Sequence, residues 1–327
     1  MKKEDLRIIF MGTPEFAVES LKSLVEGGYK VVAVVTQPDK PVGRHQDTLQ
    51  ASPVKQYALS QNLPVLQPVK MKDPEFVEQL RSYRADLQVV VAFRMLPEVV
   101  WAMPRFGTFN VHAALLPQYR GAAPINWAVI NGETETGVTT FFLDHDIDTG
   151  RIIMQQPFAV PDDADVEYVY DGLMVLGAQT ALKTIDLLLE GDGNVPSMAQ
   201  TELEASHAQL HHAPKIFKET CRIDFAMPVK RVYDFVRGLS PYPGAWTVIQ
   251  KEGGKEQVLK IFKTAKTAIP VDEGVKTGTL RVDGKSLLVA CTDCWLQLEA
   301  LQLSGKKRME ARDFLNGMRD VENYVCQ

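Results

Sequence analysis

The start of the chain contains a strand, a helix and a second strand whose spacing strongly restricts the fold class. The apolar run Arg7–Met11 ends at Gly12, and Thr13 with Pro14 forms a good start for the helical pattern that follows. Lys30–Thr36 is the next apolar run. Two buried strands joined by a helix predict a parallel βαβ unit, and hence an α/β fold with a Rossmann-like, mostly parallel sheet. Since neither a G-x-G-x-x-G nor a P-loop lysine pattern follows the first strand, a dinucleotide or nucleoside triphosphate is poorly supported.

Length and composition indicate a globular protein with room for two domains. The 327 residues are 45% hydrophobic and 24% charged. The four cysteines, at positions 221, 291, 294 and 326, are too few and too unevenly spaced for a disulfide framework. The first residues pass from charges directly into a strand, and no run approaches the roughly 20 apolar residues of a membrane span. We therefore expect a cytoplasmic protein without a membrane segment.

A change of composition divides the chain. Residues 191–214 are rich in Gly, Pro, His and polar side chains, and they predict a linker between a first domain, residues 1–190, and a second, residues 215–327. The second part carries 19 Lys plus Arg against 14 Asp plus Glu, a net +5, whereas the preceding residues have a net charge of −10. A basic domain attached to an acidic one suits a polyanionic partner, although solvated charged faces are common.

The second part shows short strand patterns with turns between them. These patterns favour a small OB-like β-barrel. The expected strands are Thr247–Ile249, Gln257–Lys263, Thr277–Val282, Ser286–Ala290 and Trp295–Leu303, between the helices Val229–Leu239 and Ala311–Met318.

The segment Phe109–Pro124 places polar side chains at the end of a buried strand. Asn110 and His112 are two residues apart and therefore share one face. The carboxyl end of a strand is where open α/β sheets place their sites. A carboxamide and an imidazole can bracket one carbonyl oxygen, with Asp148 from a separate loop on the imidazole side. Such a trio suits attack by an external amine on an acyl carbon. Taken singly, each residue would more often be a cap, an interior histidine or a turn residue.

These motifs resemble a known family. NVHAALLPQYRGAAPIN and LDHDIDTGRII are similar to the signature of the 10-formyltetrahydrofolate-dependent formyltransferases, and MGTPEFAVESL, TQPDKPVGR and SPVK narrow the resemblance to members that act on methionyl-tRNA. The resemblance spans almost the whole chain. It implies that Asn110, His112 and Asp148 are catalytic. It further implies a monomer that uses 10-formyltetrahydrofolate to make formylmethionyl initiator tRNA for translation initiation.

The resemblance also implies two groups of binding residues. Those for folate are Phe93, Arg94, Met95, Leu96, Ala114, Leu115, Leu116, Pro117 and Asp144. The sequence departs from the family there, because Phe93-Arg94 stands where Tyr-Gly is common and Ala114 stands where a Ser is frequent. Those for tRNA are Lys40 and Arg44, whereas Lys306, Lys307 and Arg308 are candidates for phosphate contact because they form a basic cluster directly after the last expected strand. The first two lie in the segment 37–53, which predicts a long loop that is either functional or a passive surface.

Other interpretations stay open at this point. We expect no metal: the Asp144–Asp148 loop lacks the later Gly and closing Glu of a calcium site, His211-His212 has no partner at ligand spacing, and Cys291-x-x-Cys294 has no second pair. The acceptor could instead be an amino-sugar nucleotide, glycinamide ribonucleotide or water. A non-catalytic RNA-binding module is a further alternative.

Overall fold

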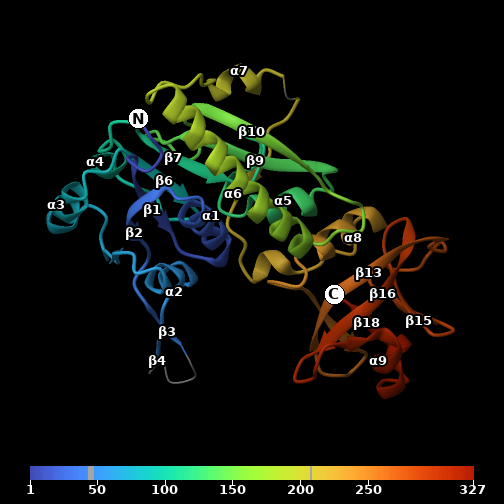
Figure 1. Cartoon of the computed structure of the whole chain (residues 1–327). Coiled ribbons are helices and arrows are strands. Elements are labelled where there is room, and N and C mark those ends of the chain that lie inside the picture. The colour runs from blue at the N-terminus through green and yellow to red at the C-terminus, as the bar shows by residue number, and fades with distance from the viewer. Residues whose placement is uncertain (43–47, 207) are drawn as a thin grey trace. The chain divides into compact units, whose positions relative to one another are not determined.

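The computed structural model describes residues 1–42, 48–206 and 208–327 (Figure 1). The chain forms two compact units. Unit 1 comprises residues 1–121, 135–159 and 170–212, and unit 2 comprises residues 122–134, 160–169 and 213–327. Arg44, expected to bind tRNA, lies outside the described residues.

Unit 1 is built on a seven-stranded sheet in the order β10-β9-β7-β6-β1-β2-β5. The five strands from β7 to β5 pair in parallel, while β9 and β10 are antiparallel additions. This arrangement confirms the predicted Rossmann-like, mostly parallel sheet. The strands are β1 (Arg7–Gly12), β2 (Lys30–Val35), β5 (Val65–Leu66), β6 (Leu87–Val91), β7 (Thr108–His112), β9 (Glu135–Phe142) and β10 (Ile152–Ala159).

Helices cover this sheet, and the longest is amphipathic toward it. Figure 1 shows α6 running across one face of the sheet, where the Oγ1 atoms of Thr184 and Thr140 lie 2.8 Å apart. The 25-residue α6 is long and apolar enough to cross a membrane, since one 18-residue window has a mean hydropathy of 1.3. Val169, Leu173, Ile185 and Leu188 are buried in the fold while Val175 is exposed, and we interpret α6 as a core helix. The helices are α1 (Glu15–Glu26), α2 (Pro53–Ser60), α3 (Pro74–Ser82), α4 (Glu98–Trp101), α6 (Val166–Glu190) and α7 (Gln200–Glu204).

Two local expectations for unit 1 were wrong. Thr13 does not cap α1, because the N-cap is Pro14 and makes no side-chain cap hydrogen bond; the Thr13 hydroxyl instead accepts a bond of 3.5 Å from Thr36 Oγ1. The predicted loop 37–53 contains two strands, β3 (Lys40–Val42) and β4 (Thr48–Gln50), which pair antiparallel. Three-residue strands of mixed polarity carry too little periodicity to be recognised.

Unit 2 is a nearly closed antiparallel barrel, which confirms the predicted β-barrel. Its strands follow the order β14-β15-β16-β13-β12-β18, with β17 added to β16. A bridge between Thr279 and Val325 brings the two ends of the sheet together. The strands are β12 (Ala245–Lys251), β13 (Gln257–Pro270), β14 (Leu280–Asp283), β15 (Ser286–Ala290), β16 (Cys294–Leu303), β17 (Met309–Glu310) and β18 (Tyr324–Cys326).

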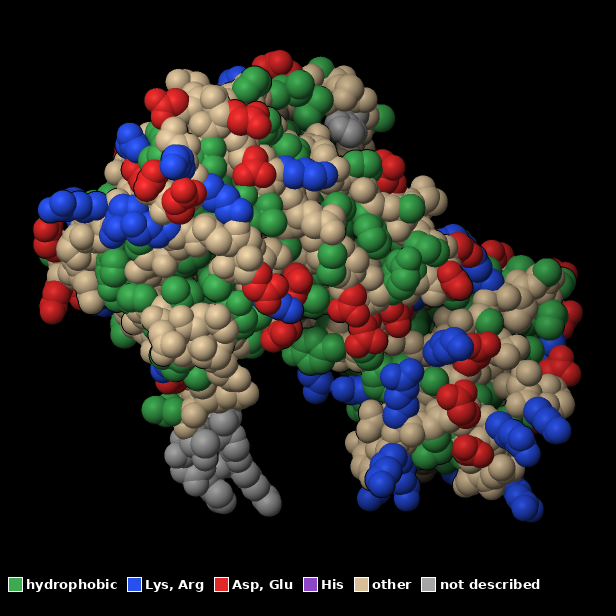
Figure 2. All heavy atoms as spheres, viewed as in Figure 1, with side chains coloured by type: hydrophobic (Ala, Val, Ile, Leu, Met, Phe, Trp, Pro, Cys, Tyr) green, Lys and Arg blue, Asp and Glu red, His purple; other side chains and the backbone are tan. Residues whose placement is uncertain are grey.

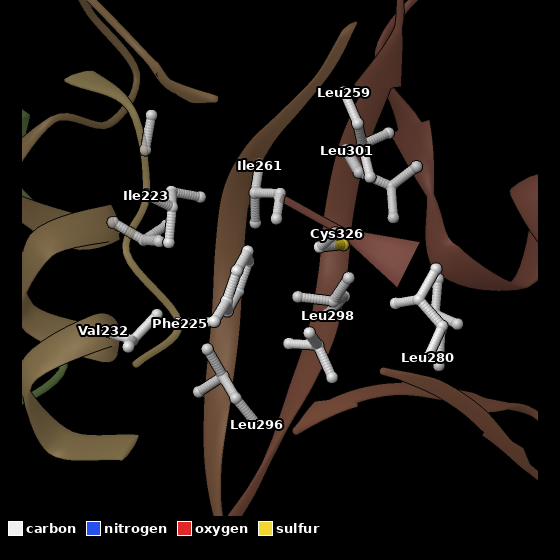
Figure 3. Packing of buried hydrophobic residues seen from close by; sticks show 14 of the residues in the cluster. Ile223, Phe225, Val232, Leu259, Ile261, Leu280, Leu296, Leu298, Leu301 and Cys326 are labelled. Carbon is white, nitrogen blue, oxygen red and sulfur yellow. The ribbon is translucent and has the colours of Figure 1, made fainter. Parts of the chain in front are cut away.

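The core of unit 2 lies between the barrel and a strongly amphipathic helix. Val232 of α8 packs toward Ile223 and Phe225, which face Ile261 and Leu296 of the barrel (Figure 3). The remaining elements are α5 (Pro124–Ile130), α8 (Val229–Gly238), α9 (Ala311–Gly317), η1 (Glu219–Cys221) and η2 (Val321–Asn323), besides the short strands β8 (Arg120–Gly121) and β11 (His212–Ala213). Within unit 2, α5 packs on α8, where Asn126 donates to Gly238 O at 2.9 Å.

Candidate active site

Strand β7 positions the first two candidate catalytic residues. Phe109 and Val111 are buried, at 0% and 3% exposure, and they fix the strand in the sheet core. Asn110 and His112 alternate with them and therefore share the other face. On the neighbouring β9, Asn110 is opposite Phe141 and His112 is opposite Thr139. His112 is the last residue of β7, as the sequence pattern predicted.

Each nitrogen of the His112 imidazole faces an oxygen atom. It is 6% exposed and meets the Phe141 ring edge to face. Nε2 lies 2.9 Å from the carbonyl oxygen of Tyr119. Because a carbonyl only accepts, Nε2 carries a hydrogen, which leaves Nδ1 as the nitrogen that can gain or lose a proton. Nδ1 is 3.9 Å from Asp148 Oδ2.

Asp148 reaches His112 from the loop between β9 and β10. Its side chain is 13% exposed, and Oδ2 accepts a hydrogen bond of 3.0 Å from the backbone N–H of Gly121. At 3.9 Å the contact with His112 is longer than a hydrogen bond, so it becomes an ion pair only when the imidazole is protonated. The structure thus brings His112 and Asp148 together, although 36 positions separate them in the sequence.

Asn110 presents a polar group that the fold leaves unused. Its Oδ1 atom is buried and has no hydrogen-bond partner among the described residues. Buried polar atoms are nearly always paired, so this atom calls for an explanation, and a polar ligand in the site would supply one. Asn110, His112 and Asp148 together offer a carboxamide, an imidazole nitrogen that can take up a proton and a carboxylate, which is the set needed to stabilise an oxyanion and collect a proton.

A residue that the sequence analysis missed joins these segments. Gln200 of α7 is 3% exposed, and its Nε2 donates to the carbonyl oxygens of Asp148, at 2.8 Å, and Gly150, at 2.9 Å. Its Oε1 accepts from Arg120 Nε and Nη2, at 2.9 and 2.6 Å. Arg120 also pairs with Glu204. Gln200 lies in the polar stretch predicted as a linker, where nothing in the residue pattern distinguishes it.

The first group of folate candidates follows β6. Met95 is 66% exposed, whereas Leu96 is buried at 7%. The guanidinium of Arg94 donates to the carbonyl oxygens of Pro68 and Val69, and desolvation lowers its pKa. Arg94 is therefore tied to the segment after β5, and its guanidinium lies 5.6 Å from the ring centroid of Phe93.

The second group follows β7 and is mostly enclosed. Ala114, Leu116 and Pro117 are buried, and Leu115 is half-buried. Ala114 O accepts from Thr139 Oγ1 at 2.7 Å. The backbone of this segment is also engaged within the fold, because Leu116 N donates to Thr139 Oγ1 at 3.0 Å and Leu116 O accepts from Gln155 Nε2 at 2.7 Å.

Asp144 follows β9, whereas the other folate candidates follow β6 or β7. It is exposed and follows β9, where Leu143 N donates to Thr108 O at the start of β7. Its Oδ1 accepts from the backbone N–H of His145 at 2.6 Å. Asp144 is therefore anchored near the first residue of β7, whereas His112 is the last.

Apart from Arg44, which lies outside the described residues, the candidate tRNA residues are exposed. Lys40 lies in β3 of unit 1. Lys306, Lys307 and Arg308 are exposed in the turn between β16 and β17 of unit 2, and the Arg308 guanidinium lies 4.5 Å from the Phe262 ring centroid. Figure 2 shows Lys and Arg side chains projecting from the visible face of unit 2, with Asp and Glu between them.

In residues 1–42, 48–206 and 208–327 no three His, Cys, Asp or Glu side chains gather so that they could hold a metal ion. Cys291 N donates to Cys294 O at 3.2 Å, and both thiols are free. His211 stacks on the ring of Tyr119 at 5.7 Å between centroids.

The comparisons with known proteins define the class to which this fold and site belong. Residues 6–185 match the model of the formyl transferase family, and residues 215–319 match the model of the formyl transferase C-terminal domain. The chain belongs to the formyl transferase family. More particularly, it is similar to the methionyl-tRNA formyltransferases of Parabacteroides distasonis, with 61% identity over 99% of both chains, and Bacteroides fragilis, with 57% identity over 99% of this chain and 98% of the relative.

Solved structures share the fold at much lower identity. HypX from Aquifex aeolicus in complex with tetrahydrofolic acid matches with a TM-score of 0.60 and 17% identity; the match covers 97% of this chain and 48% of HypX. The N-formyltransferase from Helicobacter canadensis in complex with folinic acid and dTDP-3-aminofucose matches with a TM-score of 0.60 and 17% identity, over 93% of this chain and all of that one. These two structures support the fold.

Proposed function

We propose that this protein transfers the formyl group of 10-formyltetrahydrofolate to the α-amino group of methionine on initiator tRNA. The observation that carries the proposal is the 61% identity to a methionyl-tRNA formyltransferase over 99% of the chain, in a protein that also has His112 and Asp148 in contact. The product is formylmethionyl initiator tRNA for translation initiation. We place the enzyme in the cytoplasm, as a monomer.

In the proposed reaction the acceptor amine attacks the formyl carbon directly. An α-amino group has an ordinary pKa near 8, so a substantial share is neutral at physiological pH. Asn110 would donate from its amide nitrogen to the oxyanion that develops. His112, with Nε2 committed to Tyr119 O, would take up at Nδ1 the proton that the attacking amine loses, and it would then stabilise the oxyanion or pass that proton to the folate nitrogen that leaves. Asp148 would hold the protonated imidazole or collect the proton of the amine.

One observation supports a polar ligand such as a folate at this site. Asn110 Oδ1 is buried and has no hydrogen-bond partner in the part of the chain that the structure describes, and a ligand that donates to it would remove this cost. We propose that the folate is bound by Phe93, Arg94, Met95, Leu96, Ala114, Leu115, Leu116, Pro117 and Asp144. Hydrogen bonds from the Arg94 guanidinium to the carbonyl oxygens of Pro68 and Val69 hold this cation against the segment after β5.

We assign tRNA binding to both units. Lys306, Lys307 and Arg308 are exposed cations in one turn of unit 2, and Lys40 is exposed in β3. Cations of this kind contact phosphates and make affinity depend on salt. The net +5 charge of residues 215–327 supports the same partner.

Formylation of purified methionyl initiator tRNA with 10-formyltetrahydrofolate tests the proposal. Methionyl elongator tRNA and an amino-sugar nucleotide serve as parallel acceptors. We expect transfer to the initiator tRNA alone. Transfer only to the sugar nucleotide would contradict the proposed acceptor and keep the chemistry, whereas tRNA binding without any transfer would favour an RNA-binding module.

A further inference from the structure

Gln200 uses its whole side-chain amide within the fold. The two hydrogens of Nε2 go to Asp148 O and Gly150 O, while Oε1 accepts two bonds from Arg120. A side-chain amide offers two donor hydrogens and two acceptor lone pairs, so every one is paired. A buried amide is costly unless it is paired in this way, and its orientation is therefore fixed.

The hydrogen bonds of Gln200 reach the two segments whose oxygen atoms face the nitrogens of His112. One segment carries Asp148, whose Oδ2 faces His112 Nδ1. The other contains Arg120, which stands between Tyr119, the acceptor for His112 Nε2, and Gly121, the donor to Asp148 Oδ2. Gln200 therefore joins, through one side chain, the two backbone stretches that set the position of the imidazole and its carboxylate.

The turn at Asp148 needs such support. The φ angle of Asp148 is +55°, in the left-handed region that residues other than glycine rarely adopt. The turn is also closely packed, because a Cβ added at Gly150 would lie 1.7 Å from Phe142 O. The two carbonyl oxygens that accept from Gln200 Nε2 belong to Asp148 itself and to Gly150, two residues further along the turn.

We propose that Gln200 is a positioning residue for the reaction, acting through Asp148: its two donated hydrogen bonds hold the 148–150 turn so that the carboxylate faces His112. This inference rests on the proposed function. Arg120, paired with Glu204, orients the Gln200 amide so that its nitrogen faces the two carbonyls. Part of the segment that the composition predicts as a linker thus takes part in building the site within unit 1.

The substitution Gln200→Glu isolates the donated bonds. A glutamate keeps the shape and still accepts from Arg120, but its oxygens cannot donate to Asp148 O or Gly150 O. We expect kcat for formyl transfer to fall about 10- to 100-fold, since misplacement of a catalytic group by about 1 Å can cost on the order of a hundredfold. We expect the KM values for 10-formyltetrahydrofolate and methionyl-tRNA to stay within about threefold.

The same substitution at Gln118 is the matched control. Gln118 Nε2 donates to Gln209 O at 2.8 Å, and its Oε1 accepts from His211 N at 2.8 Å. Gln118→Glu therefore loses a hydrogen bond donated to Gln209, which lies in the same segment 191–214 as Gln200, without touching residues 148–150. We expect its kcat to stay within about twofold of wild type. Equal losses in the two variants would overturn the proposal, because any loosening of this stretch would then suffice.

Two further measurements separate positioning from general structural support. In an Asp148→Asn background, Gln200→Glu should cost less than about twofold, since residues that act as a unit are not additive; a full additional loss would overturn the proposal. Hydrogen exchange of the Gly121 amide, which bonds Asp148 Oδ2, should speed up in Gln200→Glu and not in Gln118→Glu. If the wild-type protein formylates no acceptor, the proposed function fails, and unchanged exchange at Gly121 would still refute the positioning role.

Discussion

Replacement of Asp148 by Asn should slow formyl transfer by about three orders of magnitude. The carboxylate lies 3.9 Å from His112 Nδ1, and the two side chains are 13% and 6% exposed. At an effective dielectric constant of about 20, a full charge pair at this distance is worth about 4 kcal/mol. Since about 1.4 kcal/mol corresponds to a factor of ten in rate, loss of the pair in the transition state costs about a thousandfold in kcat.

The asparagine variant keeps the geometry and removes the charge. Its amide oxygen can still accept from Gly121 N, so the turn keeps the bond that Asp148 Oδ2 now makes. Single-turnover formylation of methionyl-tRNA with saturating 10-formyltetrahydrofolate measures the chemical step. Asp146→Asn is the control, because Asp146 is an exposed carboxylate on the same loop, and it should transfer formyl at the wild-type rate.

A rate for Asp148→Asn within about tenfold of wild type would refute this reasoning. It would mean that His112 does not become cationic in the transition state, or that Asp148 does not face the charge. A loss of similar size in Asp146→Asn would point to the charge of the whole loop instead.

Three other outcomes are expected. Asn110→Ala should lower kcat about 100- to 1,000-fold through loss of an oxyanion donor, and near-normal turnover in purified protein would exclude that role. Burial raises the pKa of both Cys291 and Cys326 to about 12. Unfolded thiols ionise near pH 9, so between about pH 9 and 12 the unfolded state binds fewer protons than the folded state, and urea midpoints for unit 2 should fall as the pH rises through this range. A flat profile of midpoint against pH would count against this. Asp234→Ala should destabilise unit 2 by about 3–5 kcal/mol in urea titrations, because it leaves the 6%-exposed Arg237 without its carboxylate; a cost below about 1 kcal/mol would show that the pair is dispensable.

Local patterns in the sequence were sufficient to predict the sheet of unit 1 and the barrel of unit 2. Apolar runs with a helix between them led to the parallel sheet, and the short alternating strands after residue 214 led to the barrel. Boundaries were less accurate where a strand lost its alternation: β13 runs to Pro270, seven residues beyond its expected end at Lys263. The hairpin of β3 and β4 was missed because three-residue strands have almost no periodicity.

The grouping of helices in space was beyond sequence patterns. The α5 helix follows the central motif directly, yet it packs on α8 within unit 2, where Asn126 bonds to a residue 112 positions away. An amphipathic pattern indicates that a helix has a buried face, but it does not indicate which distant face will cover it.

The sequence by itself determined the α/β class, the barrel and the shared face of Asn110 and His112, because the two-residue repeat of a strand is a local property. The tertiary structure alone decided that His112 Nε2 bonds to Tyr119 O, that Nδ1 meets Asp148, and that Gln200 reaches Asp148 across 52 positions. These contacts depend on where loops close and on a left-handed turn at Asp148. Such geometry follows from the packing of the whole unit, since no spacing of residues along the chain encodes it.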